Sequence, residues 1–221
     1  MSEVLLRKDP YGDGSAMLYD KYHRNSIRTK LTTRREVSVL RKALQRAGHN
    51  LSALDLPCGA GRFWPAFAAA GVQDLIAADV SQGMLDVAQT HRISDTIPSR
   101  LECMSAFDVD LPDEAVDFVA CMRFLHHLSG REDRLQVLSE LHRVTKKFVA
   151  ISLWVEGSLG ARRRMRKPAI EPESGFGRRI CRSRLDVEEE FHTAGFTIAQ
   201  HYDVWPRLSM WRLYLLEKQN V

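Results

Sequence analysis

Short apolar runs alternate with amphipathic stretches along most of the chain. Five runs of four to six residues are apolar enough to form buried strands: residues 51–56, 75–79, 101–104, 117–122 and 148–153. Apolar side chains at helical spacing fill the intervals at residues 63–70, 81–88 and 132–144. Strands that alternate with helices predict an α/β fold, Rossmann-like, with a mostly parallel sheet and helices on both faces.

Two further strands are predicted near the end of the chain, at residues 197–203 and 211–217. Only residues 204–210 separate them, which is too short for the crossover that a parallel pair needs. They should therefore pair antiparallel, so the pattern predicts a seven-stranded sheet with a C-terminal antiparallel hairpin. Before this hairpin, Ser183 is expected to cap a helix that runs to Ala194.

The segment before the first strand is predicted to hold an amphipathic helix within residues 18–47, because its apolar side chains keep helical spacing. We interpret residues 1–46 as an N-terminal basic helical cap segment. Residues 47–221 then form one domain, which suits a chain of 221 residues. An insertion at residues 155–184 interrupts this domain after the fifth strand.

Charge is unevenly distributed around a net value of +4. The net charge is +6 over residues 1–46 and +6 over residues 155–184, whereas residues 47–154 carry −5. Two basic segments therefore flank an acidic centre. Arginine side chains bind phosphate and carboxylate groups in a forked geometry, so this distribution favours an anionic partner.

Several classes of protein are excluded by what the sequence lacks. No stretch approaches the roughly 20 apolar residues that cross a bilayer, and the first residues lack the apolar core of a secretory signal. The four cysteines, Cys58, Cys103, Cys121 and Cys181, lie far apart, so neither a zinc site nor a disulfide framework is predicted. We expect a cytoplasmic protein without a metal ion or a transmembrane segment.

A glycine-containing loop follows the first predicted strand, at residues 54–61. Gly59 and Gly61 permit a tight turn and a close approach of the main chain to a ligand. Asp79 ends the second strand, 18 residues after Gly61. A carboxylate at that place can accept hydrogen bonds from both hydroxyls of a ribose.

These features resemble the motifs of class I S-adenosylmethionine (SAM)-dependent methyltransferases. The resemblance rests on blocks that keep the family's order and spacing: residues 54–61, 77–88, 108–112 with 115–119, 122–128 and 140–144. It covers about residues 50 to 155 and is greatest toward the small-molecule branch that includes quinone-biosynthesis methyltransferases. It implies an enzyme that transfers a methyl group from SAM and releases S-adenosylhomocysteine.

The resemblance also implies which residues of the first two motifs bind SAM. Asp55 would orient the glycine loop or meet the SAM amino group, and Asp79 would hold the ribose hydroxyls. The main chain at Pro57, Gly59 and Gly61 would pass close to the methionine portion. Pro57 stands where the family usually has its first glycine.

Further cofactor contacts are implied downstream. Val80 and Met84 would pack on adenine, and Arg123 would lie near the methionine atoms. Phe107 occupies the position where the family usually has an acidic residue, and Asp108 follows it. We therefore retain both Phe107 and Asp108 as candidates for the contact with adenine.

Methyl transfer from a sulfonium is an in-line displacement, which depends mainly on alignment. A general base is needed only where the acceptor loses a proton, and His126 is the catalytic candidate for that role. Residues 123–126 do not resemble the signature of amino-methylating DNA and glutamine methyltransferases. Oxygen, carbon and other nitrogen acceptors remain open.

The acceptor is predicted to be anionic: a phosphorylated glycolipid, another lipid or a small metabolite. The residues that would bind it lie in the basic insertion: Arg162, Arg163, Arg164 and Arg166. RNA is a weaker candidate, because Phe176 is the insertion's single aromatic residue and bases bind by stacking. Peripheral membrane contact through the same arginines is open, although no apolar anchor stands beside them in the sequence.

Two other classes of function compete with this reading. A non-catalytic SAM-binding regulatory or scaffold protein would keep the same cofactor motifs. A nicotinamide-dependent oxidoreductase would share the glycine loop and the acidic residue after the second strand. That second alternative is disfavoured, because the loop is not GxGxxG and the predicted hairpin differs from a doubly wound sheet.

Overall fold

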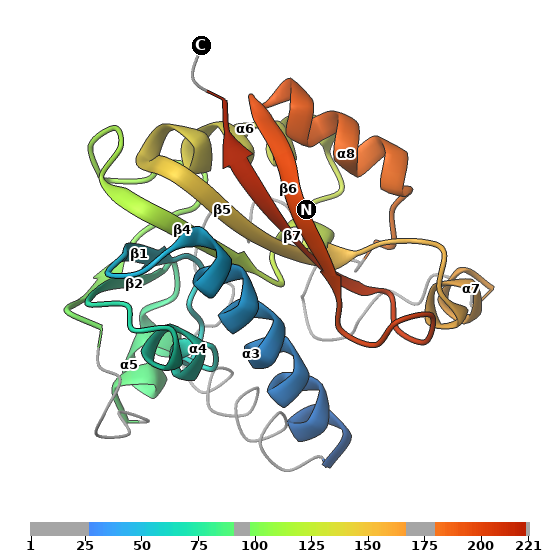
Figure 1. Cartoon of the computed structure of the whole chain (residues 1–221), viewed down its shortest axis with the longest axis horizontal. Helices are drawn as coiled ribbons and strands as arrows, with labels where there is room; N and C mark the ends of the chain where they lie inside the picture. Colours follow the sequence, from blue (N-terminus) through green and yellow to red (C-terminus); the bar gives the residue numbers. More distant parts are fainter. Residues whose placement is uncertain (1–26, 91–97, 167–179, 220–221) are drawn as a thin grey trace.

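Seven strands form one mixed sheet in the computed structural model, which describes residues 27–90, 98–166 and 180–219 (Figure 1). The strands are β1 (Ser52–Asp55), β2 (Asp74–Asp79), β3 (Arg100–Cys103), β4 (Val116–Met122), β5 (Thr145–Trp154), β6 (Phe196–Asp203) and β7 (Trp211–Lys218). Their order across the sheet is β3-β2-β1-β4-β5-β7-β6. Strands β1 to β5 pair in parallel, whereas β7 pairs antiparallel with both β5 and β6. The predicted sheet and its C-terminal hairpin are confirmed.

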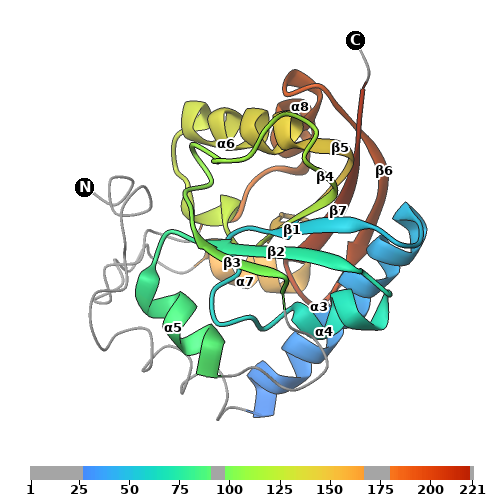
Figure 2. The same ribbon diagram turned by 90° about the vertical axis from the view of Figure 1, so that its left-hand side faces the viewer.

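Helices cover both faces of this sheet, as Figure 2 shows. One face carries α3 (Ile27–Ala47), α4 (Trp64–Ala69) and α5 (Gln82–Thr90), and the other carries α6 (Arg131–Val144) and α8 (Arg184–Thr193). Successive residues of β4 are therefore buried on opposite faces. Phe118 packs into the core layer under α3 and α4, and Val119 packs into the layer on the other face. Strands buried on both faces read as continuous apolar runs, which explains why they were predictable.

Helix α3 is attached to the C-terminal hairpin by side chains far apart in sequence. The Arg35 Nε donates a hydrogen bond to the carbonyl of Val204, 3.2 Å away. Glu36 is fully buried and pairs with Arg123, whose Nε lies 2.7 Å from its Oε1. The Arg123 guanidinium also stacks over the Trp211 ring, 4.5 Å from its centroid. The division of the chain after residue 46 stays a prediction, but α3 clearly packs on the sheet.

Three local predictions need comment. Ser81 caps α5, since its Oγ accepts a hydrogen bond from the Met84 N–H, whereas the Ser183 hydroxyl at the start of α8 makes no capping hydrogen bond. The first nine residues of the helix predicted at 18–47 lie outside the described part of the chain. The insertion contains a short helix that was not predicted, α7 (Leu159–Met165), capped by Ser158. Phe176 lies in the part of the insertion that the structure does not describe.

No helix within the described ranges combines the length and the apolar character that a bilayer span requires.

Candidate functional site

The glycine loop leaves β1 at a place where the strand order reverses, with β2 on one side and β4 on the other. Hydrogen bonds attach the loop to both neighbours: the Leu56 N–H donates to Ala120 of β4 at 3.0 Å, and the Cys58 N–H donates to Ala78 of β2 at 2.8 Å. Ligands of open α/β sheets bind at such a switch point, beyond the carboxyl ends of the strands. The loop is therefore fixed where a ligand is expected.

Gly59 and Gly61 both adopt positive φ angles, +53° and +72°, in the region that favours glycine. A Cβ on Gly61 would lie 2.7 Å from the Trp64 ring, so the loop and this ring are in close contact. A Cβ on Gly59 would meet nothing within 4 Å. The main chain at Gly59 thus borders open space in which a ligand can approach it.

Asp79 joins the second strand to this loop. One of its carboxylate oxygens accepts a hydrogen bond from the Gly59 N–H at 2.8 Å, and the other accepts one from the Ser81 N–H at 3.0 Å. The side chain is held at the carboxyl end of β2, where only 5% of the residue is exposed. Each carboxylate oxygen can accept two hydrogen bonds, so this arrangement is compatible with ribose hydroxyls as further donors.

Asp55 is fully buried at the end of β1, and neither of its carboxylate oxygens has a hydrogen-bond partner among the described residues. Burial raises the pKa of Asp55 well above its ordinary value, and the negative charge of Asp79 raises it further. The indole N–H of Trp64 and the Arg62 guanidinium act in the opposite direction. The Trp64 indole N–H is near Asp55 but makes no hydrogen bond of normal geometry with it, so the buried acid is incompletely satisfied and the site is suited to a ligand that brings a cation or a donor.

The residues expected to flank adenine follow β2: Val80 comes directly after this strand, and Met84 lies on α5. Met104, just after β3, donates its N–H to the carbonyl of Asp79 at 3.1 Å, which places the ends of β2 and β3 side by side. Val80 is half-buried at that edge. Met84 is buried in a small cluster that includes Ala60 of the glycine loop. The structure thus brings Val80 and Met84 next to the loop, while their contact with adenine stays a prediction.

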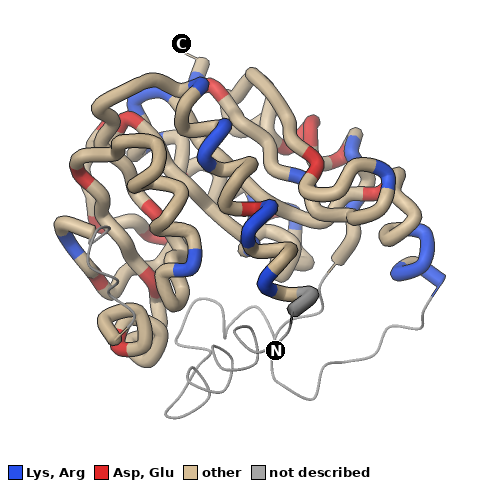
Figure 3. Tube along the Cα trace, turned by 60° about the horizontal axis from the view of Figure 1, so that its bottom comes forward, with Lys and Arg blue, Asp and Glu red and all other residues tan. Residues whose placement is uncertain are grey.

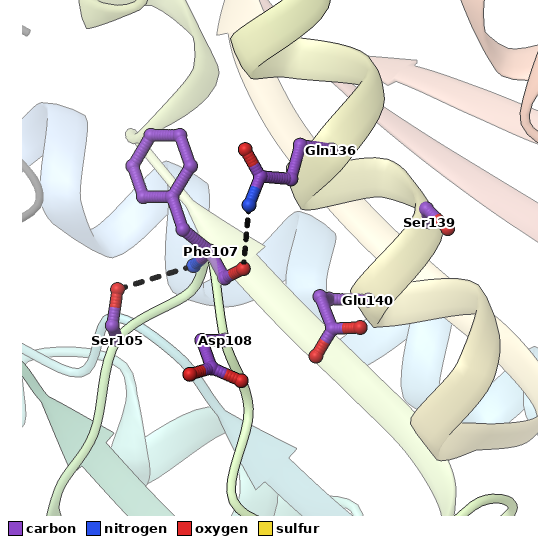
Figure 4. Close-up of a pocket in the computed structure, with 6 residues that line it drawn as sticks. All are labelled: Ser105, Phe107, Asp108, Gln136, Ser139 and Glu140. Carbon is purple, nitrogen blue, oxygen red and sulfur yellow. Dashed lines mark hydrogen bonds between the residues drawn. The ribbon is translucent and has the colours of Figure 1, made fainter.

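Phe107 and Asp108 have different surroundings. The Phe107 side chain is buried and its ring packs edge-on against Phe124, with centroids 6.1 Å apart. Asp108 is exposed and borders a cavity of about 680 Å³ between this segment and α6 (Figure 4). The cavity is lined by Ser105, Phe107, Asp108, Gln136, Ser139 and Glu140. Its main-chain wall is fixed because Gln136 donates a hydrogen bond to the Phe107 carbonyl at 3.0 Å.

Arg123 follows β4 with a φ angle of +59°, which is unusual for a residue with a side chain. Its N–H donates to the carbonyl and to the hydroxyl of Ser152. Its guanidinium is directed to Glu36 and Trp211, as described above. We expected Arg123 near the methionine atoms, and the structure adds a partner that sequence reasoning missed. The sequence signal that could have pointed to this partner is that Glu36 is the one acidic residue within residues 27–47.

His126 lies in a single turn of 3₁₀ helix, η1 (Leu125–His127), at the same edge of the sheet, and only 1% of the residue is exposed. Its ring stacks on Trp154, with centroids 5.2 Å apart, and meets the Trp211 ring edge-on at 4.9 Å. The ring of His127 lies beside it at 4.2 Å. These rings enclose the imidazole, and its role as a general base stays a prediction.

The arginines expected to bind the acceptor lie on and just after α7, which follows the carboxyl end of β5. Arg162, Arg163 and Arg166 are exposed, whereas Arg164 is half-buried, and its charge lowers the pKa of the Cys181 thiol against a larger rise caused by burial. Figure 3 shows Lys and Arg clustered on α7 and recurring along α3. The exposed basic residues of α3 are Lys30, Arg34, Arg35, Arg41, Lys42 and Arg46. The two basic segments predicted from the sequence therefore both present charge to solvent.

Within the described ranges, no three His, Cys, Asp or Glu side chains are grouped so that they could hold a metal ion.

Two curated relatives are similar to this chain, both from Schizosaccharomyces pombe. An uncharacterized methyltransferase-like protein is 31% identical over 166 residues, which is 63% of this chain and 61% of the relative. An uncharacterized methyltransferase is 34% identical over 95 residues, which is 42% of this chain and 34% of the relative. The chain thus spans about three fifths of the first relative and one third of the second.

Solved structures share the fold at lower identity. Magnesium protoporphyrin IX methyltransferase from Synechocystis PCC 6803, with bound SAH, superposes with a TM-score of 0.72 at 17% identity, over 99% of this chain and all of that one. A SAM-dependent methyltransferase from Clostridium acetobutylicum has a TM-score of 0.65 at 15% identity, over 93% and 98% of the two chains. Residues 54–151, which hold the glycine loop, Asp79 and the end of β4, match the family described as methyltransferase domain. Residues 54–151 of this chain therefore resemble a methyltransferase domain, and the chain shares the fold of these SAM-dependent methyltransferases.

Proposed function

We propose that this chain transfers a methyl group from SAM to an anionic acceptor. The observation that carries the proposal is the buried carboxyl of Asp55 at the end of β1, which makes no hydrogen bond of normal geometry and lies close enough to Asp79 for that charge to raise its pKa. These residues fit SAM, because its cationic amino group would supply the missing partner of Asp55 and its ribose would supply donors to Asp79. The open space at Gly59 leaves room for the connecting atoms.

Bound SAM supplies a methyl group that is already activated on a positively charged sulfur. The contribution of this chain is then to bind and align. Asp79 would fix the ribose, the main chain at Gly59 and Gly61 would follow the methionine portion, and Val80 and Met84 would hold adenine. Holding the acceptor atom, the methyl carbon and the sulfur in line can raise the reaction rate by several orders of magnitude without any further chemistry from the protein. His126 would accept a proton where the acceptor must lose one.

The acceptor is proposed to be a phosphorylated glycolipid, another lipid or a small anionic metabolite, methylated at oxygen, carbon or nitrogen. Two observations support it. The arginines of α7 stand beyond the carboxyl end of β5, at the same edge of the sheet as the cofactor loops. Arg164 is half-buried, and salt screens partly buried charges less than exposed ones.

Calorimetric titration of the chain with SAM and, separately, with NADH tests the cofactor. We expect binding of SAM and none of NADH. Methyl transfer is then assayed with labelled SAM on lipid, RNA and metabolite fractions of a cell extract. Label in an anionic lipid or metabolite that declines in the variant Arg162→Ala/Arg163→Ala/Arg164→Ala supports the acceptor class. Absence of SAM binding would refute the proposal, and label confined to RNA would refute the acceptor.

The variant Asp55→Asn should stabilise the ligand-free chain at neutral pH while weakening SAM binding. An unfolded Asp titrates near a pKa of about 3.9, and burial holds the folded pKa well above that. Below the unfolded value both states are protonated and the carboxyl has no effect on stability. As pH rises above it, the unfolded chain loses its proton first and the folded state is progressively disfavoured. Asparagine removes this penalty.

Thermal unfolding at about pH 4 and about pH 8 measures the effect. The unfolding temperature of Asp55→Asn should rise at the higher pH only, by about 2–4 °C for each kcal/mol of added stability. Asp117→Asn is the matched control. Hydrogen bonds from Ser52 and the charge of Lys146 lower the pKa of Asp117, so its removal should reduce stability at neutral pH. An unfolding temperature for Asp55→Asn equal to or below that of the native chain at the higher pH would contradict the interpretation.

A further inference from the structure

Helix α7 and the loop between β6 and β7, residues 204–210, form one surface, which we call the tip surface. The Leu159 N–H donates to the carbonyl of Arg207 at 3.0 Å, and the Gly160 N–H donates to the carbonyl of Leu208 at 2.9 Å. A Cβ on Gly160 would lie 2.7 Å from that Leu208 carbonyl oxygen, so glycine permits the close contact. The two segments lie side by side at the edge of the molecule in Figure 1.

Apolar side chains are exposed on the tip surface to an unusual degree. Leu159, Met165 and Leu208 are 49%, 56% and 62% exposed. They are three of the five large apolar residues that are exposed within the described part of the chain. Grouped apolar side chains that remain in solvent mark an interaction site more often than a random surface.

The same surface is strongly basic. Arg162, Arg163, Arg166 and Arg207 are all exposed on it. Neither residues 157–166 nor residues 204–210 contain an Asp or Glu. Helical spacing places Leu159 on the face of α7 that carries Arg162 and Arg163, opposite the buried Ala161, whereas Met165, the last residue of the helix, is exposed on another side.

We propose that the tip surface docks on an anionic lipid bilayer. Arginines alone would fit any phosphate-rich partner, but leucine and methionine between them match the boundary between charged headgroups and acyl chains. The expectation that no apolar anchor stands beside the arginines is corrected: Leu159 and Met165 are exposed next to them in the sequence, and the fold brings Leu208 next to α7. Docking goes beyond the proposed methyl transfer and does not depend on it, and it would present the neighbouring sheet edge to lipid-linked acceptors.

Sedimentation of the full chain with vesicles tests the proposal, without SAM present. Vesicles of phosphatidylcholine are compared with vesicles that also contain phosphatidylglycerol. We expect binding to the anionic vesicles alone, and weaker binding at higher salt. The variants Met165→Ser/Leu208→Ser and Arg162→Ala/Arg163→Ala/Arg166→Ala should each reduce the partition coefficient by about tenfold or more.

Two matched controls show whether loss of binding is specific to the tip surface or follows from removing any exposed leucine or any exposed positive charge. Leu185→Ser changes a leucine of α8 that is 78% exposed, and Lys147→Ala removes an exposed charge at the opposite end of β5 from α7. Both should bind vesicles as the native chain does, and circular dichroism verifies that every variant is folded. The proposal is overturned if anionic vesicles do not bind the chain, if the serine variant binds them undiminished, or if the controls lose as much binding. If the arginine variant loses vesicle binding while the serine variant keeps it, the surface binds charge alone, which would indicate a nucleic acid or another polyanion as the partner and overturn the proposal.

Discussion

Replacing Asp79 with alanine should weaken SAM binding by about a hundredfold or more, because two charge-assisted hydrogen bonds to the ribose would be lost at about 1.5–3 kcal/mol each. The same carboxylate holds the Gly59 and Ser81 N–H groups, so its removal also takes away one of the hydrogen bonds that attach the glycine loop to β2. Both effects act in the same direction. Titration calorimetry with SAM measures the combined loss.

Asp79→Asn separates these contributions, since the amide keeps one acceptor oxygen but no charge. Its affinity should fall between those of the native chain and the alanine variant. Asp86→Ala is the matched control, because Asp86 is exposed on the adjoining helix α5, where its side chain accepts a hydrogen bond from Gln82. It should bind SAM with unchanged affinity. If Asp79→Ala bound SAM with native affinity, Asp79 would not be the residue that binds the ribose.

Glu190→Gln should cost the fold about 3–5 kcal/mol, because it removes one charge of a buried ion pair and leaves the other uncompensated. The Arg134 Nε lies 2.8 Å from Glu190, and the side chains of the pair are 4% and 5% exposed. Arg134 also donates to the carbonyls of Leu128, Ser129 and Gly130. This pair therefore joins α6 and α8 to the segment that follows His126.

A second arginine increases the expected loss. Arg182 donates to the carbonyls of Leu128 and Ser129, which Arg134 also contacts, and the Arg134 charge lowers the pKa of Arg182 in addition to the lowering by burial. Without the Glu190 carboxylate, two neighbouring cations would share neutral carbonyls. Urea unfolding measures the free-energy change.

Glu189→Gln serves as the matched control for Glu190→Gln. Glu189 is 73% exposed and 3.6 Å from Arg131, so its loss should change stability by no more than about 0.5 kcal/mol. Equal effects of the two substitutions would show that the buried pair contributes nothing beyond a surface pair.

The strands of the sheet could be predicted from the sequence, because each strand is marked by a short run of adjacent residues. Strands buried on both faces produce apolar runs, and the seven-residue loop at 204–210 excluded a parallel crossover for the last two. Residues of the first two motifs could be placed by resemblance, since the loop geometry of Gly59 and Gly61 depends on adjacent residues. That Asp55 would be buried without a hydrogen-bond partner was not predictable, because its surroundings come from several strands.

The missed features all depend on contacts between distant parts of the chain. Glu36 and Arg123 are 87 positions apart, and Arg134 and Glu190 are 56 apart. Neither pair follows a periodicity that a pattern could detect. Leu208 likewise joins the arginines of α7 only after the hairpin has folded back beside that helix.

The attachment of α3 to the hairpin has a consequence for the order in which the nascent chain can fold. Helix α3 is synthesised before every strand, yet Arg35 is bonded to a carbonyl 169 positions later, and Trp211, which stacks on the partner of Glu36, opens the last strand. Contacts of such separation form late, because the intervening chain must be ordered first. Helix α3 can pack on α4, which follows it directly, as soon as both are made, but its bonds to the hairpin have to wait for the last strand.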